Sequence, residues 1–478
     1  MGSKREHGGF ILGKMKQLWL IGIGAVLRVL VSLNFSAVAQ REQPSPLPLE
    51  EMRAFTEVFE AIKRGYVDPV EDKKLFNEAI NGMLTGLDPH SAYLDVDAYK
   101  ELQVGTTGEF GGLGIEVSME DGFVKVVSPI DDTPAQRAGL MPGDLIIKLD
   151  ETSVKGMSLN DAVKQMRGKP NTPITLTVVR KGSEKPLTFT LTRAVIKIQS
   201  VKAKLLEPDF GYVRLTQFQE HTGETMAKTI EGLYKQNGGN LKGLVLDLRN
   251  DPGGLLNGAV AVSAAFLPHN ALVVYTEGRT EDAKMRLTAS GEFYLRGRSR
   301  EDYIQKLPPA VKSVPMVVLV NSGSASASEI VAGALQDHKR ATIMGTQTFG
   351  KGSVQTILPL GNSTAIKLTT ARYYTPNGRS IQAKGIVPDI IVEDPNNPGD
   401  TGVRIREADL GRHLTSRNRE TAKPEPEVKP PIIKAPVLEP GQKPPASKPE
   451  PGEIVSKNDF QLNEAVKHLK GGSQVTAR

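Results

Sequence analysis

Three mostly apolar runs in the middle of the chain limit its fold more than any other feature. Helix-like sequence separates them, and the runs are Leu244–Leu248, Ala271–Tyr275 and Met316–Val320. Runs of this length are typical of buried strands, and their alternation with helices predicts an α/β domain. We place this domain at residues 193–400. Its polar, Arg-rich segment from Thr280 to Leu307 is predicted to be a surface loop.

Composition excludes several classes of protein. With 478 residues, of which 39% are hydrophobic, the chain can form more than one domain. It has 60 Lys and Arg against 54 Asp and Glu, and a leader segment holds much of the excess. We therefore expect no nucleic-acid partner. The absence of cysteine excludes a thiol nucleophile, disulfides and thiolate metal sites, and we expect no metal and no cofactor.

The leader is the first 39 residues. Basic residues precede the apolar run Leu18–Leu27, and Ala37-Val38-Ala39 places small residues before Gln40. This pattern predicts a signal peptide at residues 1–39 and an exported chain that begins at Gln40. An uncleaved membrane anchor is the alternative, although Arg28 interrupts the apolar run before the roughly 20 residues that a spanning helix needs.

Residues 40–102 are predicted to form a helical N-terminal region. Apolar residues recur at helical spacing and give one helix an apolar face: Phe55, Val58, Phe59 and Ile62. We expect breaks at Gly65 and at Leu87-Asp-Pro-His90. The pattern leaves open whether the apolar face packs on the rest of the chain or on a second copy.

Residues 103–192 have the pattern of a small β domain. Two predicted strands, Ile115–Met119 and Phe123–Val127, flank an Asp-Gly turn and form a hairpin. A helix at Leu159–Met166 and a final strand at Ile174–Val179 follow.

This block resembles a PDZ domain, most specifically in Ala138-Gly-Leu-Met-Pro-Gly-Asp-Leu145. The resemblance implies that a loop made of Gly111, Gly112, Leu113 and Gly114 binds the terminal carboxylate of a peptide, which adds as a strand. A simple turn is the alternative for this loop. We expect Arg167, just after the predicted helix, to couple peptide occupancy to the α/β domain. A solvated helix-end cation is an equally good interpretation of Arg167.

A candidate nucleophile lies where the strand Met316–Val320 runs into a small-residue turn and then a helix. This arrangement places a serine hydroxyl at a helix N-terminus, where backbone N–H groups can hold an oxyanion. A helix cap is the alternative role for any one serine. A nucleophilic serine also needs a base. His338 lies about three helical turns beyond Ser326 and has no Asp partner nearby in sequence, so a Ser–His–Asp triad is unsupported.

Lysine offers a better base. Lys351 stands between glycines, just before the strand-like Val354–Leu358. Because side chains on a strand repeat with period two, Lys351 and Gln355 are predicted to share one face. A buried lysine amine beside an amide oxygen can be neutral near pH 7 and accept a serine proton. A solvated surface charge is the alternative.

Three segments together resemble the carboxyl-terminal processing proteases, the tail-specific serine peptidases with a Ser–Lys dyad. They are Ser324–Ile330, Thr348–Gln355 and Asp247–Leu255, and the likeness extends upstream to Gly86–Tyr93. The resemblance implies a multidomain α/β protein: a crotonase/ClpP-like protease core, an inserted PDZ domain and a helical N-terminal region.

Site roles follow from this resemblance. It places the nucleophile at Ser326, the general base at Lys351 and the amide that orients the lysine at Gln355. The oxyanion hole falls on the backbone N–H of Ala327 and of either Gly253 or Gly254, and the choice between the two glycines stays open.

The implied function is that of a periplasmic endopeptidase that captures protein C-termini on its PDZ domain and cleaves them. Expected partners are protein substrates with free C-termini and a periplasmic lipoprotein adaptor, with a homo-oligomer as a candidate assembly. A catalytically silent PDZ scaffold and a peptide-binding protein are the alternatives.

The C-terminal tail departs from this pattern. Ten prolines lie between Glu420 and Gly452, so residues 401–457 are predicted to be a disordered linker that supplies little core. A short amphipathic helix is expected within residues 458–478.

Overall fold

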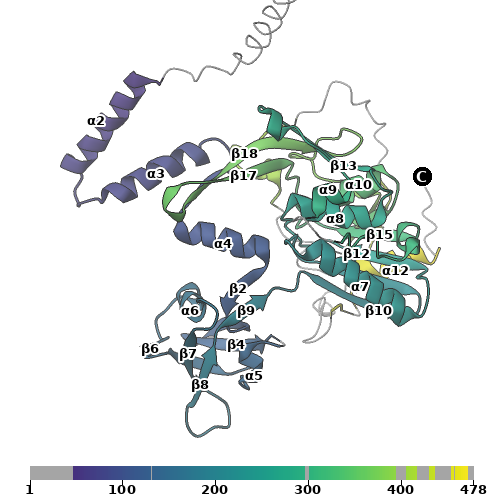
Figure 1. Ribbon diagram of the computed structural model, residues 1–478, viewed down its shortest axis with the longest axis horizontal. Coiled ribbons are helices and arrows are strands. Elements are labelled where there is room, and N and C mark those ends of the chain that lie inside the picture. The colour runs from purple at the N-terminus through teal and green to yellow at the C-terminus, as the bar shows by residue number, and fades with distance from the viewer. Residues whose placement is uncertain are drawn as a thin grey trace, which may run out of the picture. The chain divides into compact units, whose positions relative to one another are not determined.

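The structure is a computed structural model that describes residues 47–130, 132–295, 301–394, 405–416, 430–435, 454–456 and 458–471 (Figure 1). The predicted signal peptide lies outside these residues. Within them, no helix has the length and apolar character needed to cross a bilayer. The chain divides into two compact units after Phe76.

The N-terminal unit holds α2 (Leu49–Gly65) and the start of α3 (Asp72–Thr85). Helix α2 ends at Gly65, as predicted from the sequence. The rings of Phe59 and Phe76 lie 4.9 Å apart and join the two helices. Phe55 is 48% and Val58 60% exposed, so much of the predicted apolar face of α2 is exposed within the described part of its unit.

Residues 103–192 form the predicted β domain. Its sheet has the order β3-β4-β5-β7-β8, with β6 beside β5. The strands are β3 (Ile115–Glu120), β4 (Phe123–Pro129), β5 (Leu145–Leu149), β6 (Thr152–Ser153), β7 (Pro173–Val179) and β8 (Leu187–Thr192). The hairpin turn between β3 and β4 is present, because Asp121 and Gly122 both adopt positive φ. The strand expected to be final, β7, is followed by β8, so that part of the expectation is wrong.

Short elements complete this domain and connect it. They are α4 (Val96–Thr107), β2 (Glu109–Gly112), α5 (Pro134–Arg137), α6 (Leu159–Met166) and β9 (Ala194–Lys197). Strands β2 and β9 pair with each other and lead into and out of the domain. Helix α4 crosses the boundary predicted between residues 102 and 103.

The largest sheet has the order β10-β11-β12-β15-β16-β19-β20. Its strands are β10 (Val201–Glu207), β11 (Phe210–Leu215), β12 (Gly243–Asp247), β15 (Met316–Val320), β16 (Thr342–Gly345), β19 (Ile390–Glu393) and β20 (Ile432–Lys434). Strands β10 and β11 are antiparallel, and every pairing from β11 to β20 is parallel.

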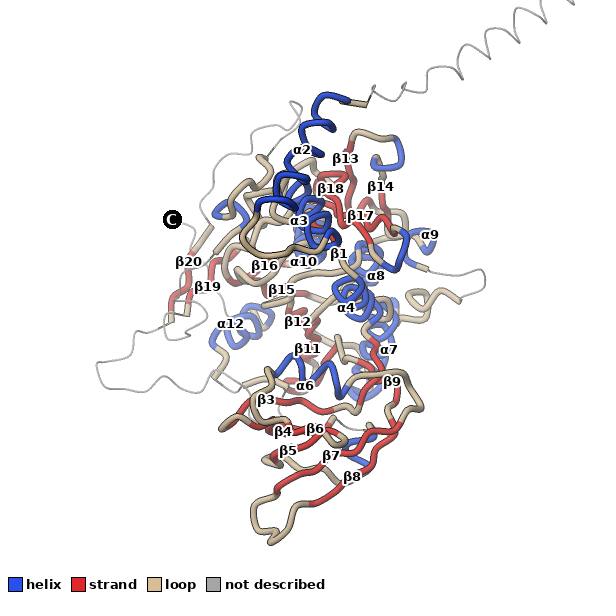
Figure 2. Tube along the Cα trace, turned by 90° about the vertical axis from the view of Figure 1, so that its left-hand side faces the viewer, coloured by secondary structure: helices blue, strands red, loops and turns tan. Residues whose placement is uncertain are grey.

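Helices cover both faces of this sheet. Helices α7 (Thr222–Asn237), α8 (Leu256–Phe266) and α10 (Ala327–Asp337) pack on the face that carries Leu246 and Val318. Helix α12 (Phe460–Leu469) packs on the opposite face, against Val245 and Val317. Figure 2 shows α12 and α7 on opposite sides of the strands.

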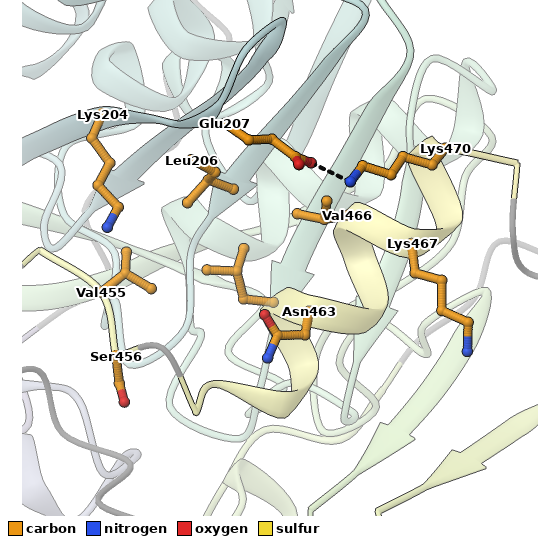
Figure 3. A pocket seen from close by; sticks show the side chains of 10 residues that line it. Lys204, Leu206, Glu207, Val455, Ser456, Asn463, Val466, Lys467 and Lys470 are labelled. Carbon is orange, nitrogen blue, oxygen red and sulfur yellow. Dashed lines mark ion pairs between the residues drawn. The ribbon is translucent and has the colours of Figure 1, made fainter.

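The tail contributes more core than the sequence predicted. Leu462 and Ala465 of α12 are buried, and Figure 3 shows α12 running beside β10, where Lys470 forms an ion pair with Glu207. Within the predicted linker, β20 pairs with β19, and Ile433 packs on the same core. The expectation of a disordered linker is therefore corrected at β20, because Ile433 supplies apolar surface that the proline count conceals.

A second, antiparallel sheet has the order β1-β18-β13-β14, with β17 beside β18. Its strands are β1 (Ala92–Leu94), β13 (Leu272–Gly278), β14 (Arg286–Thr288), β17 (Ser353–Pro359) and β18 (Ala365–Tyr374). The segment predicted as a surface loop contains β14 and α9 (Gly291–Tyr294), and it buries Leu287 and Tyr294. That prediction is wrong for these residues, because polar neighbours conceal a few core side chains. The remaining helical turns are η1 (Glu281–Ala283), η2 (Pro309–Lys312), η3 (Gly361–Ser363) and η4 (Glu407–Asp409).

Candidate active site

Two loops meet at the carboxyl ends of the neighbouring parallel strands β12 and β15. Direct hydrogen bonds hold them together. The Asn321 side-chain amide donates to the Asn250 side chain at 2.9 Å, and the Ser324 hydroxyl donates to the Leu248 carbonyl at 2.7 Å. The relative position of the two loops is therefore fixed by direct contacts.

Ser326 lies at the N-terminus of α10 in a rare backbone conformation, with φ 56° and ψ −112°. Few residues other than glycine adopt positive φ, and such strain is concentrated at functional sites. Gly253 presses against this turn from the other loop. A Cβ atom at Gly253 would lie 2.6 Å from the Ala325 carbonyl oxygen and 2.8 Å from the Ser326 Cβ. Only glycine allows this approach.

The carboxylate of Glu329 joins the serine loop to the lysine loop. Its Oε2 accepts from the backbone N–H of Ser326 at 2.8 Å and of Lys351 at 2.9 Å. Its Oε1 accepts from the N–H of Gly350 and the hydroxyl of Thr348. Burial raises the pKa of Glu329 to about 7, against the opposing effect of these donors. Sequence reasoning assigned no role to Glu329, although the Ser-x-x-Glu spacing of a capping box was visible.

Backbone N–H groups distinguish the two glycines left open by the sequence. Gly253 donates its N–H to the buried Asp251 carboxylate at 2.9 Å, so this donor is occupied. Gly254 is flanked by bonds between its neighbours and Phe218, and its own N–H has no acceptor among the residues that the structure describes. The N–H of Ala327 is unpaired in the same sense. Gly254 and Ala327 are thus the two available donors beside Ser326.

Lys351 has a fixed backbone, and its amine has no hydrogen-bond partner among the residues that the structure describes. Its N–H is held by Glu329, and its carbonyl accepts from the Tyr373 hydroxyl, which also interacts with the Ser326 side chain. Burial lowers the pKa of Lys351 to about 8, with the positive charge of Lys367 acting in the same direction. An amine in this range is neutral in a substantial fraction of molecules at slightly alkaline pH.

Gln355 belongs to a polar network that reaches the Gly86–Tyr93 segment. Its amide nitrogen donates to Ser353 at 3.0 Å and to the Thr369 hydroxyl at 3.2 Å. Thr369 in turn donates to Asp88 at 3.0 Å, and Ser91 donates to the same carboxylate at 2.7 Å. The sequence pointed to this segment only through resemblance, because a contact over nearly 300 residues leaves no local signal.

One cavity of about 610 Å³ brings the predicted residues together. All six of the proposed catalytic and oxyanion-hole residues line it: Ser326, Lys351, Gln355, Ala327, Gly253 and Gly254. No hydrogen bond between the Ser326 hydroxyl, the Lys351 amine and Gln355 is present among the described side chains. His338 lies at the far end of the 11-residue helix α10, about 17 Å along it, and its ring bonds the Leu272 carbonyl.

The predicted carboxylate loop lies at the start of the β domain. Gly111 and Gly112 belong to β2 and pair with β9, so their place is in a ladder rather than in a free loop. Leu113 and Gly114 follow, and the part of the chain that is described offers their N–H groups no acceptor. A Cβ at Gly114 would lie 2.3 Å from the Thr133 side chain, so glycine is required there.

Strand β3 leaves this loop as an edge strand of its sheet. Half-buried apolar side chains from β3 and from α6 pack beside the domain core: Ile115, Val117, Leu159 and Val163. An added strand at this edge would meet an apolar surface of this kind.

Arg167 ends α6 and is half-buried rather than solvated. Its guanidinium lies 4.7 Å from the centre of the Phe110 ring on β2. Strand β2 follows directly after α4, and Leu102 and Gly105 of α4 line the central cavity. Arg167 is therefore connected to the cavity through Phe110, β2 and α4.

Comparisons with known proteins agree with this architecture. Residues 209–392 match Peptidase family S41, residues 111–191 match the PDZ domain, and residues 28–98 match the Activating protease CtpB N-terminal domain. The chain is 46% identical over 425 residues to a Carboxy-terminal-processing protease of Bartonella bacilliformis, covering 88% of this chain and 89% of that protein.

Two further relatives carry similar descriptions. The Carboxy-terminal processing protease CtpB of Bacillus subtilis is 36% identical, over 72% of this chain and 68% of its own length. A solved structure titled Photosystem II D1 C-terminal processing protease is 31% identical, covers 71% of this chain and 92% of its own, and has a TM-score of 0.39. The family expected from the sequence is confirmed: the chain belongs to peptidase family S41 and is a carboxy-terminal processing serine protease with a PDZ domain.

Proposed function

We propose that this protease cleaves peptide bonds with Ser326 as the nucleophile and Lys351 as the general base. One observation carries the proposal: a single buried carboxylate, Glu329, holds the backbones of both residues at the wall of one cavity. The pKa of Lys351, lowered to about 8, suits a base that must be neutral to act.

The chemistry follows from these positions. Lys351 takes the proton of the Ser326 hydroxyl as the oxygen attacks the substrate carbonyl carbon. The N–H groups of Gly254 and Ala327 stabilise the oxyanion that forms. When the C–N bond breaks, the Lys351 ammonium gives its proton to the leaving amine. Water then hydrolyses the Ser326 ester, with Lys351 again as the base. Gln355 orients the neutral amine through its side-chain oxygen.

The test uses a quenched fluorogenic peptide and the chain from residue 40 onward. Wild type should cleave the peptide, while Ser326→Ala should bind it without turnover. A Ser326→Ala variant that retains turnover would remove the proposed nucleophile. The alternatives of a silent scaffold and a peptide-binding protein do not account for membership in a protease family.

The PDZ domain is proposed to select the substrate through its C-terminus. The N–H groups of Leu113 and Gly114, which meet no acceptor among the described residues, and the β3 edge support this role. Peptides that end in a free apolar carboxylate should bind about tenfold more tightly than their amides, because hydrogen bonds to a charged group are stronger. Equal affinity of the two forms would exclude carboxylate recognition.

Arg167 is proposed to transmit peptide binding to the cavity through Phe110 and α4. Arg167→Ala should weaken the activation of cleavage by a PDZ-binding peptide more than it weakens binding of that peptide. Unchanged activation in this variant would leave Arg167 with a role in packing alone.

We also propose that this protease is exported, that it forms an assembly, and that its core has a crotonase/ClpP-like fold. The sequence pattern supports cleavage before Gln40 and a periplasmic location, which N-terminal sequencing of the mature protein tests.

The exposed apolar residues of α2 support a homo-oligomer, and light scattering of the Phe55→Asp variant tests this proposal. Family membership supports a lipoprotein adaptor, and the parallel strands β11 to β19 between helical layers support a crotonase/ClpP-like core with an inserted PDZ domain.

A further inference from the structure

Strand β18 brings a second lysine to the wall of the central cavity. Lys367 lines the same cavity as Ser326 and Lys351. It is the cross-strand partner of Ile357, while Gln355 is paired with Thr369. Because partners in an antiparallel pair share a face, Lys367 lies on the face of the ribbon that carries Gln355 toward the cavity.

Lys367 is half-buried, and no carboxylate in the described part of the chain forms an ion pair with it. Exposed lysines elsewhere in this domain do have such partners, as Lys228 with Glu224 and Lys242 with Asp209. Removing a cation partly from water without a partner costs free energy. The positive charge of Lys367, which no carboxylate in the described residues neutralises, therefore acts electrostatically on the charged groups that share the cavity with it.

We propose that Lys367 is a positioning residue that acts through Lys351, its positive charge favouring the neutral, proton-accepting form of the base. Two like charges beside one low-dielectric cavity repel, and the repulsion is relieved when one of them loses its proton. A neighbouring cation is a recognised means of activating a lysine. The inference rests on the proposed role of Lys351.

Several other charged or titratable groups lie near Lys351 and influence its protonation. The acids near Lys351 come from three different elements, and they are Glu407 of η4, Glu329 of α10 and Asp88 before β1. Three more titratable groups lie close by: Tyr373 on β18, Glu101 on α4 in the cavity wall, and His90, which bonds Glu407 at 2.8 Å. With burial and Lys367 opposing the acids, the pKa of Lys351 stands at about 8.

The experiment measures kcat/KM against pH for wild type, Lys367→Met and Lys367→Arg with one fluorogenic peptide. Removing the neighbouring charge raises the pKa of Lys351, so the midpoint of the Lys367→Met profile should move to higher pH. Each unit of that shift lowers the activity near neutral pH about tenfold and leaves the alkaline plateau nearly unchanged. Lys367→Arg keeps the charge and should keep the wild-type midpoint.

Three further variants sharpen the test. Glu407→Gln removes an acid that favours the charged base, so its midpoint should move to lower pH. Lys202→Met removes a positive charge from an exposed site on β10 and should not move the midpoint. Lys367→Gln repeats the charge removal with a polar side chain in case Lys367→Met does not fold, as judged by circular dichroism.

Each outcome decides the inference. A folded Lys367→Met or Lys367→Gln enzyme with the wild-type midpoint overturns it, and so does a pH-independent rise in KM, which would make Lys367 a substrate-binding cation. Failure of the proposed base is a separate result. A Lys351→Ala enzyme that is fully active would remove Lys351 from the mechanism whatever Lys367 does.

Discussion

The two sides of the active-site cavity are built in different ways. On the serine side, two loops at the ends of β12 and β15 are joined by direct hydrogen bonds, and the reactive groups are a strained serine and backbone N–H donors. On the lysine side, Lys351 stands just before the β17–β18 ribbon, and its amine has no hydrogen-bond partner among the described residues, while Gln355 on β17 is held by Ser353 and Thr369.

This difference matches the needs of the chemistry. An oxyanion site must be rigid before the reaction begins, because its donors gain most when they need no reorganisation. A general base must accept and return a proton, so its amine cannot be engaged in a permanent ion pair. Glu329 reconciles both needs, since it fixes the backbone of Lys351 and leaves the amine free.

Ser326→Ala is the largest change on the serine side. Loss of the nucleophile should lower kcat/KM by about four orders of magnitude or more, because the covalent route is removed. Peptide binding, measured by fluorescence anisotropy, should remain within about twofold of wild type. A large loss of binding would indicate that the substitution disturbs the loop itself.

Glu329→Gln breaks the link between the two sides. The side-chain N–H₂ group of the new glutamine would face at least one of the N–H or O–H donors that now bind the Glu329 carboxylate. This conflict costs about 1–3 kcal/mol, so kcat/KM should fall by about ten- to a hundredfold. The pKa of Glu329 is raised to about 7 from 4.5 by burial. Folding thus favours the protonated form of Glu329. The stability that this protonation contributes is complete below pH 4.5 and is lost as pH rises through about 7.

The pH dependence gives this variant a second measurement. The free energy of unfolding of wild type, relative to Glu329→Gln, should decrease by up to about 3 kcal/mol as pH rises through this range. Urea unfolding at several pH values measures the difference. A difference that is constant with pH would contradict the raised pKa.

Thr369→Val affects the lysine side alone. Valine keeps the shape and removes the hydroxyl between Gln355 and Asp88. Loss of this link should reduce kcat by about tenfold, in line with one lost hydrogen bond to a charged group. KM should change less, because the hydroxyl does not line the cavity. An effect on KM alone would place Thr369 in substrate binding instead.

Leu462→Ala tests a region outside both sides. Leu462 of α12 is 3% exposed and packs under the large sheet. Its truncation should cost about 2–5 kcal/mol of stability, measured by chemical denaturation, with little change in kcat/KM while the protein remains folded. Lys467→Ala, an exposed position on the same helix, is the matched control. Equal stability of the two variants would show that α12 is not part of the core.

Local patterns predicted the elements that depend on nearby residues. The apolar runs became β12, β13 and β15, and the helix at Leu159–Met166 matches α6. The sequence alone does not distinguish Gly253 from Gly254 as a backbone donor for the oxyanion. In the structure, the N–H of Gly253 donates to Asp251, which leaves the N–H of Gly254 available.

Long-range contacts account for most of what the sequence did not predict. Glu329 looks like an ordinary helix cap until the lysine loop is placed against it. The apolar face of α12 is visible in the sequence, but its burial depends on a sheet face supplied mostly by strands more than a hundred residues earlier. The tail was therefore judged by its prolines, and its contribution to the core was underestimated.

The most direct test of the Ser–Lys mechanism is the activity of Lys351→Arg against that of His338→Ala, with both proteins shown to be folded. Guanidinium keeps its proton and cannot act as the base, so Lys351→Arg should be as inactive as Lys351→Ala. His338 bonds the Leu272 carbonyl away from the cavity, so His338→Ala should retain most of the activity. If Lys351→Arg cleaves peptide while His338→Ala does not, the base is a histidine and the lysine mechanism is wrong.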